Sequence, residues 1–112
     1  MKHLLPTLKE KNRYIVFEVI SDKTVSKDDT FNNIKEVCYG FIGKLGMAEA
    51  GLVILNFWKK QRSIIKINYK SVDKIRAALA LITKVDNQRV VVRSLGVSGI
   101  LNKAEKKFME AI

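Results

Sequence analysis

The amino-acid sequence predicts an α/β fold of ferredoxin-like type, in which two helices cover one face of a four-stranded antiparallel sheet. Three observations lead to this fold class. Runs rich in β-branched residues alternate with helical patterns in the order β-α-β-β-α-β. Crossovers between such strands are right-handed, which leaves few topologies. The first strand is apolar on both sides, so we expect both faces of the sheet to be covered. A basic C-terminal helix follows the sheet.

The first strand is predicted at residues 13–20, RYIVFEVI. Ile15, Phe17 and Val19 are expected on one face, and Tyr14, Val16 and Ile20 on the other. Residues 1–12 precede it as a basic N-terminal arm, in which Pro6 favours an extended path. We therefore divide the chain into this arm and a single domain at residues 13–112.

The first helix is predicted to open at Ser26, which is a good N-cap, with Asp28 and Asp29 in its first turn. Apolar residues then recur at intervals of three and four, so the helix buries one face. Gly43 and Gly46 are available to end it. The only cysteine, Cys38, lies on the apolar face and is interpreted as a buried structural thiol.

Two strands are predicted at residues 51–58 and 63–69, joined by a polar hairpin loop at residues 59–62. Ser71 is positioned to cap the second helix, whose apolar face includes Ile75 and Leu79. Asp86 and Asn87 then form a turn before the fourth strand.

The stretch from Gln88 to Phe108 carries most of the functional signal. Its Val-rich strand is predicted to enter a glycine-framed turn at residues 96–99 and then a helix holding Lys103, Lys106 and Lys107. Backbone N–H groups of such a turn at a helix start would cradle a phosphate. Ser98 is interpreted as the serine at the entry of this helix, and Asn102 is an alternative cap if the helix starts later.

Composition favours a partner that is a polyanion. The chain has 21 Lys and Arg against 11 Asp and Glu, a formal net charge of +10, which attracts nucleic acid or an anionic membrane. No apolar run approaches the roughly 18 residues of a membrane span, and no signal-peptide pattern opens the sequence. We therefore expect a cytoplasmic protein without a membrane partner.

Catalytic chemistry finds little support. Ser98 lies in G-x-S-G, which does not match a nucleophile elbow, and the only histidine is His3 in the arm. A metal site needs several cysteine or histidine ligands close together. This chain has one of each, Cys38 and His3, and they are far apart in the sequence. The third strand, RSIIKINY at residues 62–69, lacks the glycine and paired aromatics with which RNA-recognition motifs stack bases. Phe17, Phe57 and Trp58 are accordingly interpreted as core or interface residues.

Charge is unevenly spread along the chain, with acidic residues near the first crossover and basic residues in the second half. We expect a basic side that contacts RNA phosphates. The candidate RNA-binding residues are Lys9, Lys11, Arg13, Arg89, Arg93, Gly96, Ser98, Gly99, Lys103, Lys106 and Lys107.

Several stretches resemble the archaeal ribonuclease P protein component 2 family, the archaeal members of the family typified by the eukaryotic subunit Pop-five. They are LPTLK at residues 5–9, RYIVFE at 13–18, FIGKLGMAEAG at 41–51, LALIT at 79–83, RSLGVSG at 93–99 and KKF at 106–108. Ile100 departs from the family, which commonly has threonine there.

The resemblance implies an accessory subunit of the ribonucleoprotein that removes 5′ leaders from precursor tRNA. The RNA subunit would be the catalyst and would hold the magnesium ions, so the protein needs no cofactor and no active site of its own. Implied partners are ribonuclease P RNA, precursor tRNA indirectly, the TIM-barrel-like protein component 3, and a second copy of the chain within a heterotetramer. The alternative is a small-molecule-binding or regulatory domain of the same fold without an RNA partner.

Overall fold

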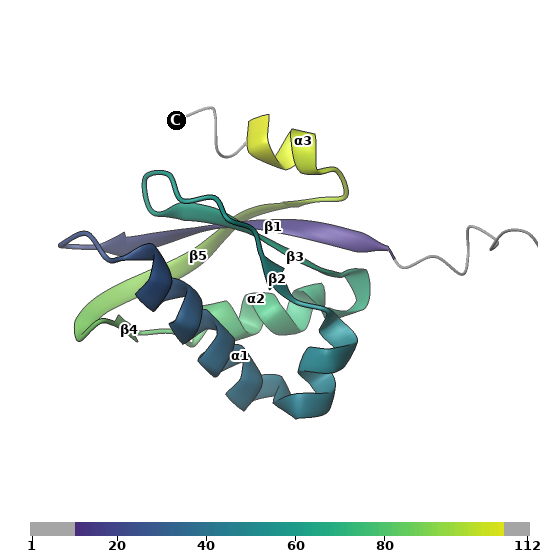
Figure 1. Ribbon diagram of the computed structural model, residues 1–112, viewed down its shortest axis with the longest axis horizontal. Coiled ribbons are helices and arrows are strands. Elements are labelled where there is room, and N and C mark those ends of the chain that lie inside the picture. Colours follow the sequence, from purple (N-terminus) through teal and green to yellow (C-terminus); the bar gives the residue numbers. More distant parts are fainter. Residues whose placement is uncertain (1–10, 107–112) are drawn as a thin grey trace, which may run out of the picture.

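The computed structural model describes residues 11–106, which form one curved sheet with helices on both sides (Figure 1). The elements are β1 (Asn12–Ser21), α1 (Lys27–Ala50), β2 (Val53–Ile54), β3 (Arg62–Asn68), the 3₁₀ turn η2 (Tyr69–Ser71), α2 (Val72–Ala80), β4 (Lys84–Val85), β5 (Gln88–Ser98) and α3 (Leu101–Ala104). The strand order is β2-β3-β1-β5-β4, and all neighbours are antiparallel. The predicted ferredoxin-like arrangement is confirmed, with the short β4 as an additional edge strand.

The central strand β1 is buried on both faces. Ile15 and Phe17 are fully buried in the main core, beneath α1 and α2. On the opposite face, Val16 packs with Ile64 and with Ala104 of α3 in a second, smaller cluster. Figure 1 shows α3 on the side of the sheet away from α1 and α2. The expectation that the second face is covered is thus met by the C-terminal helix.

The range of α1 holds two helical segments, of which the first begins and ends where predicted. The Ser26 hydroxyl accepts a hydrogen bond from the backbone N–H of Asp29 at 3.1 Å. Gly43 interrupts the helical path, with φ 76° and ψ 178°, and the chain resumes a helix that ends at Gly51, with φ 58°. Gly43 thus ends the first helical segment of α1, as predicted, and Gly51 supplies the left-handed cap of the second segment.

The two predicted strands at residues 51–58 and 63–69 are unequal. Only Val53 and Ile54 form β2, whereas β3 spans Arg62–Asn68. Beyond β2, the N–H of Phe57 donates to the carbonyl of Leu55 at 2.8 Å. This tight turn ends the regular pairing of β2 with β3. Because β2 is an edge strand with β3 as its one neighbour, local turns compete with pairing there.

The second helix starts after Ser71, but Ser71 does not cap it. Its side chain makes no cap hydrogen bond. Instead, Asn68 Oδ1 accepts from the N–H of Lys70 at 3.0 Å and opens the 3₁₀ turn η2 that leads into α2. The cap lies one turn earlier than predicted.

The glycine-framed turn predicted at residues 96–99 is a strand for most of its length. Gly96, Val97 and Ser98 continue β5 and pair with Val16, Ile15 and Tyr14 of β1. Gly96 pairs with Val16 and Ser94 with Phe17, so Leu95 is the extra residue of a β-bulge. Helix α3 then begins at Leu101, with Ile100 at its N-cap position, so neither Ser98 nor Asn102 caps it.

Two hairpin turns carry non-glycine residues with positive φ. Asp86 and Asn87 form the predicted turn between β4 and β5, with φ 54° and 60°. Lys60 and Gln61 form the tip between β2 and β3, with φ 51° and 58°, a conformation that side chains disfavour.

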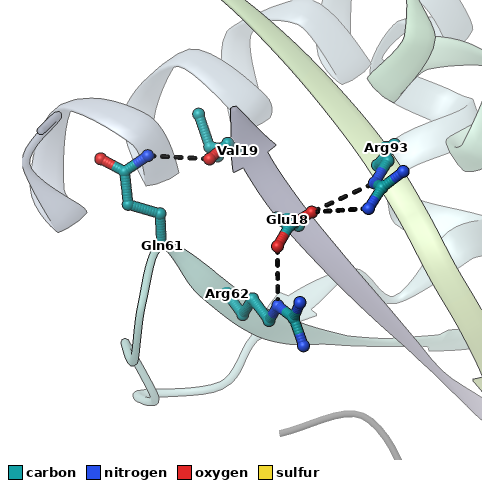
Figure 2. A network of polar contacts seen from close by, with 5 residues as sticks. All are labelled: Glu18, Val19, Gln61, Arg62 and Arg93. Atoms are coloured by element: carbon teal, nitrogen blue, oxygen red, sulfur yellow. Dashed lines mark hydrogen bonds and ion pairs between the residues drawn. The ribbon is translucent and has the colours of Figure 1, made fainter. Parts of the chain in front are cut away.

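The Gln61 side chain connects the tip of the β2–β3 hairpin to the end of β1 through hydrogen bonds. Its Nε2 donates to the carbonyl of Val19 at 2.8 Å and to the hydroxyl of Ser21 at 3.1 Å (Figure 2 shows the first contact). Its Oε1 accepts from the N–H of Val25 at 2.7 Å. These bonds hold the hairpin against the segment that leads into α1.

Replacing Gln61 with Ala should lower the free energy of unfolding by about 1–3 kcal/mol, because three hydrogen bonds are removed and two backbone groups are left without their partner. Lys60→Ala is the matched control, since Lys60 has a similar positive φ but is exposed. Urea denaturation of both variants measures the difference. Equal destabilisation by the two substitutions would show that backbone strain, not the side-chain bonds, matters at this tip.

Candidate nucleic-acid interface

A row of three charged side chains crosses the sheet on the face that carries α3. Glu18 of β1 is paired in register with Arg62 of β3 on one side and Arg93 of β5 on the other. Arg62 Nε donates to Glu18 Oε2 at 2.8 Å, and Arg93 Nε donates to Oε1 at 3.1 Å (Figure 2). A second nitrogen of Arg93, Nη2, lies 3.1 Å from the same oxygen. One carboxylate thus holds two guanidinium groups.

The two arginines of this row differ in exposure. The Arg93 side chain is 59% exposed, whereas those of Arg62 and Glu18 are 21% and 16% exposed. Two positive charges against one negative charge leave the row with a net charge of about +1. Arg93 is therefore oriented by Glu18 on one side while its outer surface faces solvent, where a phosphate can approach.

Helix α3 brings further positive charge to the same face. Ala104 is fully buried against the sheet, with Leu101 packed beside it, whereas Lys103 and Lys106 are exposed. The helix is only four residues long, so its lysines, and not its N-terminus, are the candidate anion-binding groups. Arg93, Lys103 and Lys106 thus lie on one side of the sheet, as predicted.

The start of β1, the end of β3 and the end of β5 meet at one end of the sheet (Figure 1). Arg13 lies here close to Gly99: a Cβ atom built on Gly99 would be 3.6 Å from Arg13 Nη1. Ser98 and Lys11 lie at the same end. The Ser98 hydroxyl accepts from the N–H of Ile100 at 3.1 Å, which is a local turn and not a nucleophile's environment.

Other candidate residues lie elsewhere. Arg89 pairs with Lys84 in the β4–β5 hairpin, at the opposite end of β5 from Ser98. Gly96 pairs with Val16 in mid-sheet. Lys9 and Lys107 fall outside the residues that the structure describes. The predicted set therefore separates into the Arg93–α3 side, the Arg13–Gly99 end, and an isolated Arg89.

Sequence reasoning missed Arg62, Tyr69 and Lys70. Arg62 shares a carboxylate with Arg93, and Tyr69 and Lys70 lie beside Arg13 at the sheet end. The signal for Arg62 is strand alternation, because register with Glu18 puts it on the face of Arg93. Glu18, an acidic residue of the first strand, lies between Arg62 and Arg93.

Two kinds of reactive site, an activated thiol and a metal cluster, can be checked in residues 11–106. Burial raises the pKa of the Cys38 thiol to about 11, which keeps it protonated and unreactive at neutral pH. Among residues 11–106, no group of three or more His, Cys, Asp or Glu side chains lies together as a metal site. No helix within that range is long and apolar enough to cross a membrane.

Arg62 and Arg93 should respond differently to substitution, although both contact Glu18. Arg62→Ala should lower the free energy of unfolding by about 1–2 kcal/mol, because its charge-assisted bond is largely shielded from solvent. Arg93→Ala should change it by no more than about 0.5 kcal/mol, because its pair is screened by water. Urea denaturation distinguishes them, and a larger loss for Arg93→Ala would contradict this assignment.

Comparison with known proteins shows the family of the chain. Residues 13–109 match the model of the Rpp14/Pop5 family. The chain is 37% identical to Ribonuclease P protein component 2 of Thermococcus kodakarensis, over 96% of this chain and 91% of that one. It is 38% identical to the protein of the same name in Pyrococcus abyssi, over 97% and 93% of the two chains, and 32% identical to that of Methanosarcina mazei, over 98% and 94%.

A solved structure shares the fold. A chain in the cryo-EM structure of yeast ribonuclease MRP matches with a TM-score of 0.54 and 13% identity, over 92% of each chain. At this identity the match concerns the fold alone. The sequence matches extend over nearly the whole chain, and on them the chain belongs to the Rpp14/Pop5 family.

Proposed function

We propose that this chain is a protein subunit of ribonuclease P, which binds the catalytic RNA and assists removal of the 5′ leader from precursor tRNA. The observation that carries the proposal is its near full-length similarity to archaeal chains named Ribonuclease P protein component 2. The net charge of +10 and the basic side of the sheet are what an RNA-binding subunit requires.

The RNA contact is assigned to Arg93 together with the exposed lysines of α3. Arg93 is oriented by Glu18, Lys103 lies in α3, which the buried Ala104 anchors, and Lys106 lies two residues after the end of α3. These residues share one face of the sheet, so they can follow one phosphate backbone. Phosphate contacts supply affinity and register, whereas they do not read bases.

The chemical step is assigned to the RNA. Magnesium ions held by the RNA would supply the activated water and stabilise the leaving oxygen. This chain's own residues would bind and orient the RNA backbone. Acting this way, the protein is a non-catalytic subunit of an endoribonuclease.

Protein partners are proposed to be protein component 3 and a second copy of this chain. Helix α1 exposes three large apolar side chains, Tyr39, Phe41 and Leu45, at 52%, 48% and 73% of their surface. Large apolar side chains exposed on one pair of helical segments suit a protein contact. They lie on the helical side, away from the basic face, so RNA and protein can bind together.

A small-molecule-binding domain of the same fold is the other candidate, and it is not favoured. The described depressions have volumes of about 420–470 Å³ and lie at the surface. The one beside α2 is lined by Arg76 and Ser94, which bond each other at 3.1 Å. None of these three depressions holds convergent polar groups within an apolar pocket, as a small-molecule site would.

Purification of the tagged protein from its own cells should recover ribonuclease P RNA as the most enriched transcript. Sequencing of the copurified RNA, with an untagged strain as the control, measures this. Recovery of no ribonuclease P RNA would contradict the proposed function.

Replacing Arg93, Lys103, Lys106 and Lys107 with Ala should weaken binding to ribonuclease P RNA and flatten its salt dependence. The slope of log affinity against log salt should fall by about 0.9 for each duplex phosphate that the variant no longer binds, or about 0.7 for a single-stranded one. Binding titrations between low and moderate salt measure the slope.

The matched control replaces three exposed lysines on the helical side, Lys35, Lys44 and Lys74. Their removal lowers net charge by nearly as much, yet it should leave the slope almost unchanged. Equal slopes for both variants would show that net charge, and not the Arg93–α3 face, binds the RNA.

A further inference from the structure

Tyr69 lies where β3 ends and has no role in the core. It opens the 3₁₀ turn η2, and its N–H donates to the carbonyl of Lys11 at 2.8 Å. The residue is 43% exposed, which is high for an aromatic residue beside a sheet. Its backbone is therefore fixed by the neighbouring strand while its ring faces solvent.

Three cations surround this ring. Lys11 Nζ is 6.0 Å from the ring centroid, and Lys70 Nζ and Arg13 Cζ are each 5.9 Å from it. Within residues 11–106, none of the three cations forms an ion pair with a carboxylate. No carboxylate among residues 11–106 therefore neutralises their positive charge.

We infer that Tyr69 with Lys11, Arg13 and Lys70 forms a binding site for an unpaired nucleotide of RNA. The base stacks on the Tyr69 ring, and the flanking phosphates are bound by the three cations. Lys11 and Lys70 are exposed, so their long side chains can turn from the ring to a phosphate without a change in the backbone.

The combination of groups favours RNA over an acidic protein segment. A flat ring among several cations matches a ligand that alternates a planar base with a phosphate, which is how single strands are bound. An acidic peptide would use the cations but not the ring face. A duplex would use the cations as well, yet its bases are stacked on one another and closed to Tyr69.

The proposed stacking differs from that of RNA-recognition motifs, in which bases stack on aromatic residues of the sheet. Tyr69 lies beyond the end of β3 and not on the face of the sheet. The site deepens the proposed function and rests on it for the identity of the RNA. It adds that the RNA at the Arg13–Gly99 end is single-stranded, whereas the Arg93–α3 face follows a backbone of either kind.

The test uses fluorescence anisotropy with a labelled oligouridine of about ten nucleotides, and a blunt RNA duplex of equal length. Tyr69→Leu should weaken oligouridine binding about tenfold or more, because one base loses its stacking partner, and should change duplex binding less than twofold. Tyr69→Phe should retain the affinity, because the ring is kept. Phe57→Leu, in the loop after β2, is the matched control, since Phe57 is an aromatic residue of similar exposure, 39%.

A second arm replaces Lys11, Arg13 and Lys70 with Ala. The salt slope for oligouridine should fall by about 0.7 for each phosphate that the variant no longer binds. The inference is overturned if Tyr69→Leu binds oligouridine as the parent protein does, if the parent protein does not bind it, or if duplex and single strand weaken equally. If the variants of Tyr69 and its three cations bind oligouridine normally but bind protein component 3 more weakly, these residues form a protein contact instead.

These results are separable from the proposed function, because the probes contain no ribonuclease P sequence. Loss of oligouridine binding in Tyr69→Leu, with no ribonuclease P RNA recovered from cells, would retain the site and reject the function. The reverse outcome would retain the function and reject the site.

Discussion

The burial of β1 on both faces is the constraint on which the rest of the structure depends. Ile15 and Phe17 require the cover of α1 and α2, whereas Val16 on the other face requires a separate cover. Helix α3 provides it through Ala104, although the helix has only four residues. The hydrophobic demand of one strand therefore places Lys103 and Lys106 over the sheet, beside Arg93. Packing of the core and the position of the basic side have the same cause.

Ion pairs within the sheet also orient the basic side chains on this face. Glu18 lies between Arg62 and Arg93 on neighbouring strands, and it orients both guanidinium groups while neutralising only one charge. At the end of the sheet, the cations around Tyr69 have no carboxylate partner within the described residues. The basic surface thus has an ordered part, shaped by ion pairs, and a part whose charge is available to a ligand.

Local chemistry made much of the fold predictable. The Ser26 cap, the Asp86–Asn87 turn and the 59–62 hairpin are short-range features, and right-handed crossovers then settle the strand order. The turn at residues 96–99 was predicted wrongly because pairing with β1 overrides the local preference of glycine. Arg62 and the Tyr69 cluster were missed because their partners come from different strands, so register and not sequence distance brings them together. The assignment of Arg93 and the neighbouring lysines to RNA contact stays a prediction, drawn from net charge and from their clustering after the Val-rich strand.

Amide hydrogen exchange of the full chain, with and without ribonuclease P RNA, tests most directly whether the sheet face with α3 is the RNA-binding surface. The expected result is slower exchange in the 3₁₀ turn η2, the end of β5 and α3, with exchange in the first half of α1 unchanged. Exchange slowed only in α1 and α2, with β5 and α3 unaffected, would contradict it and would assign RNA binding to the helical side.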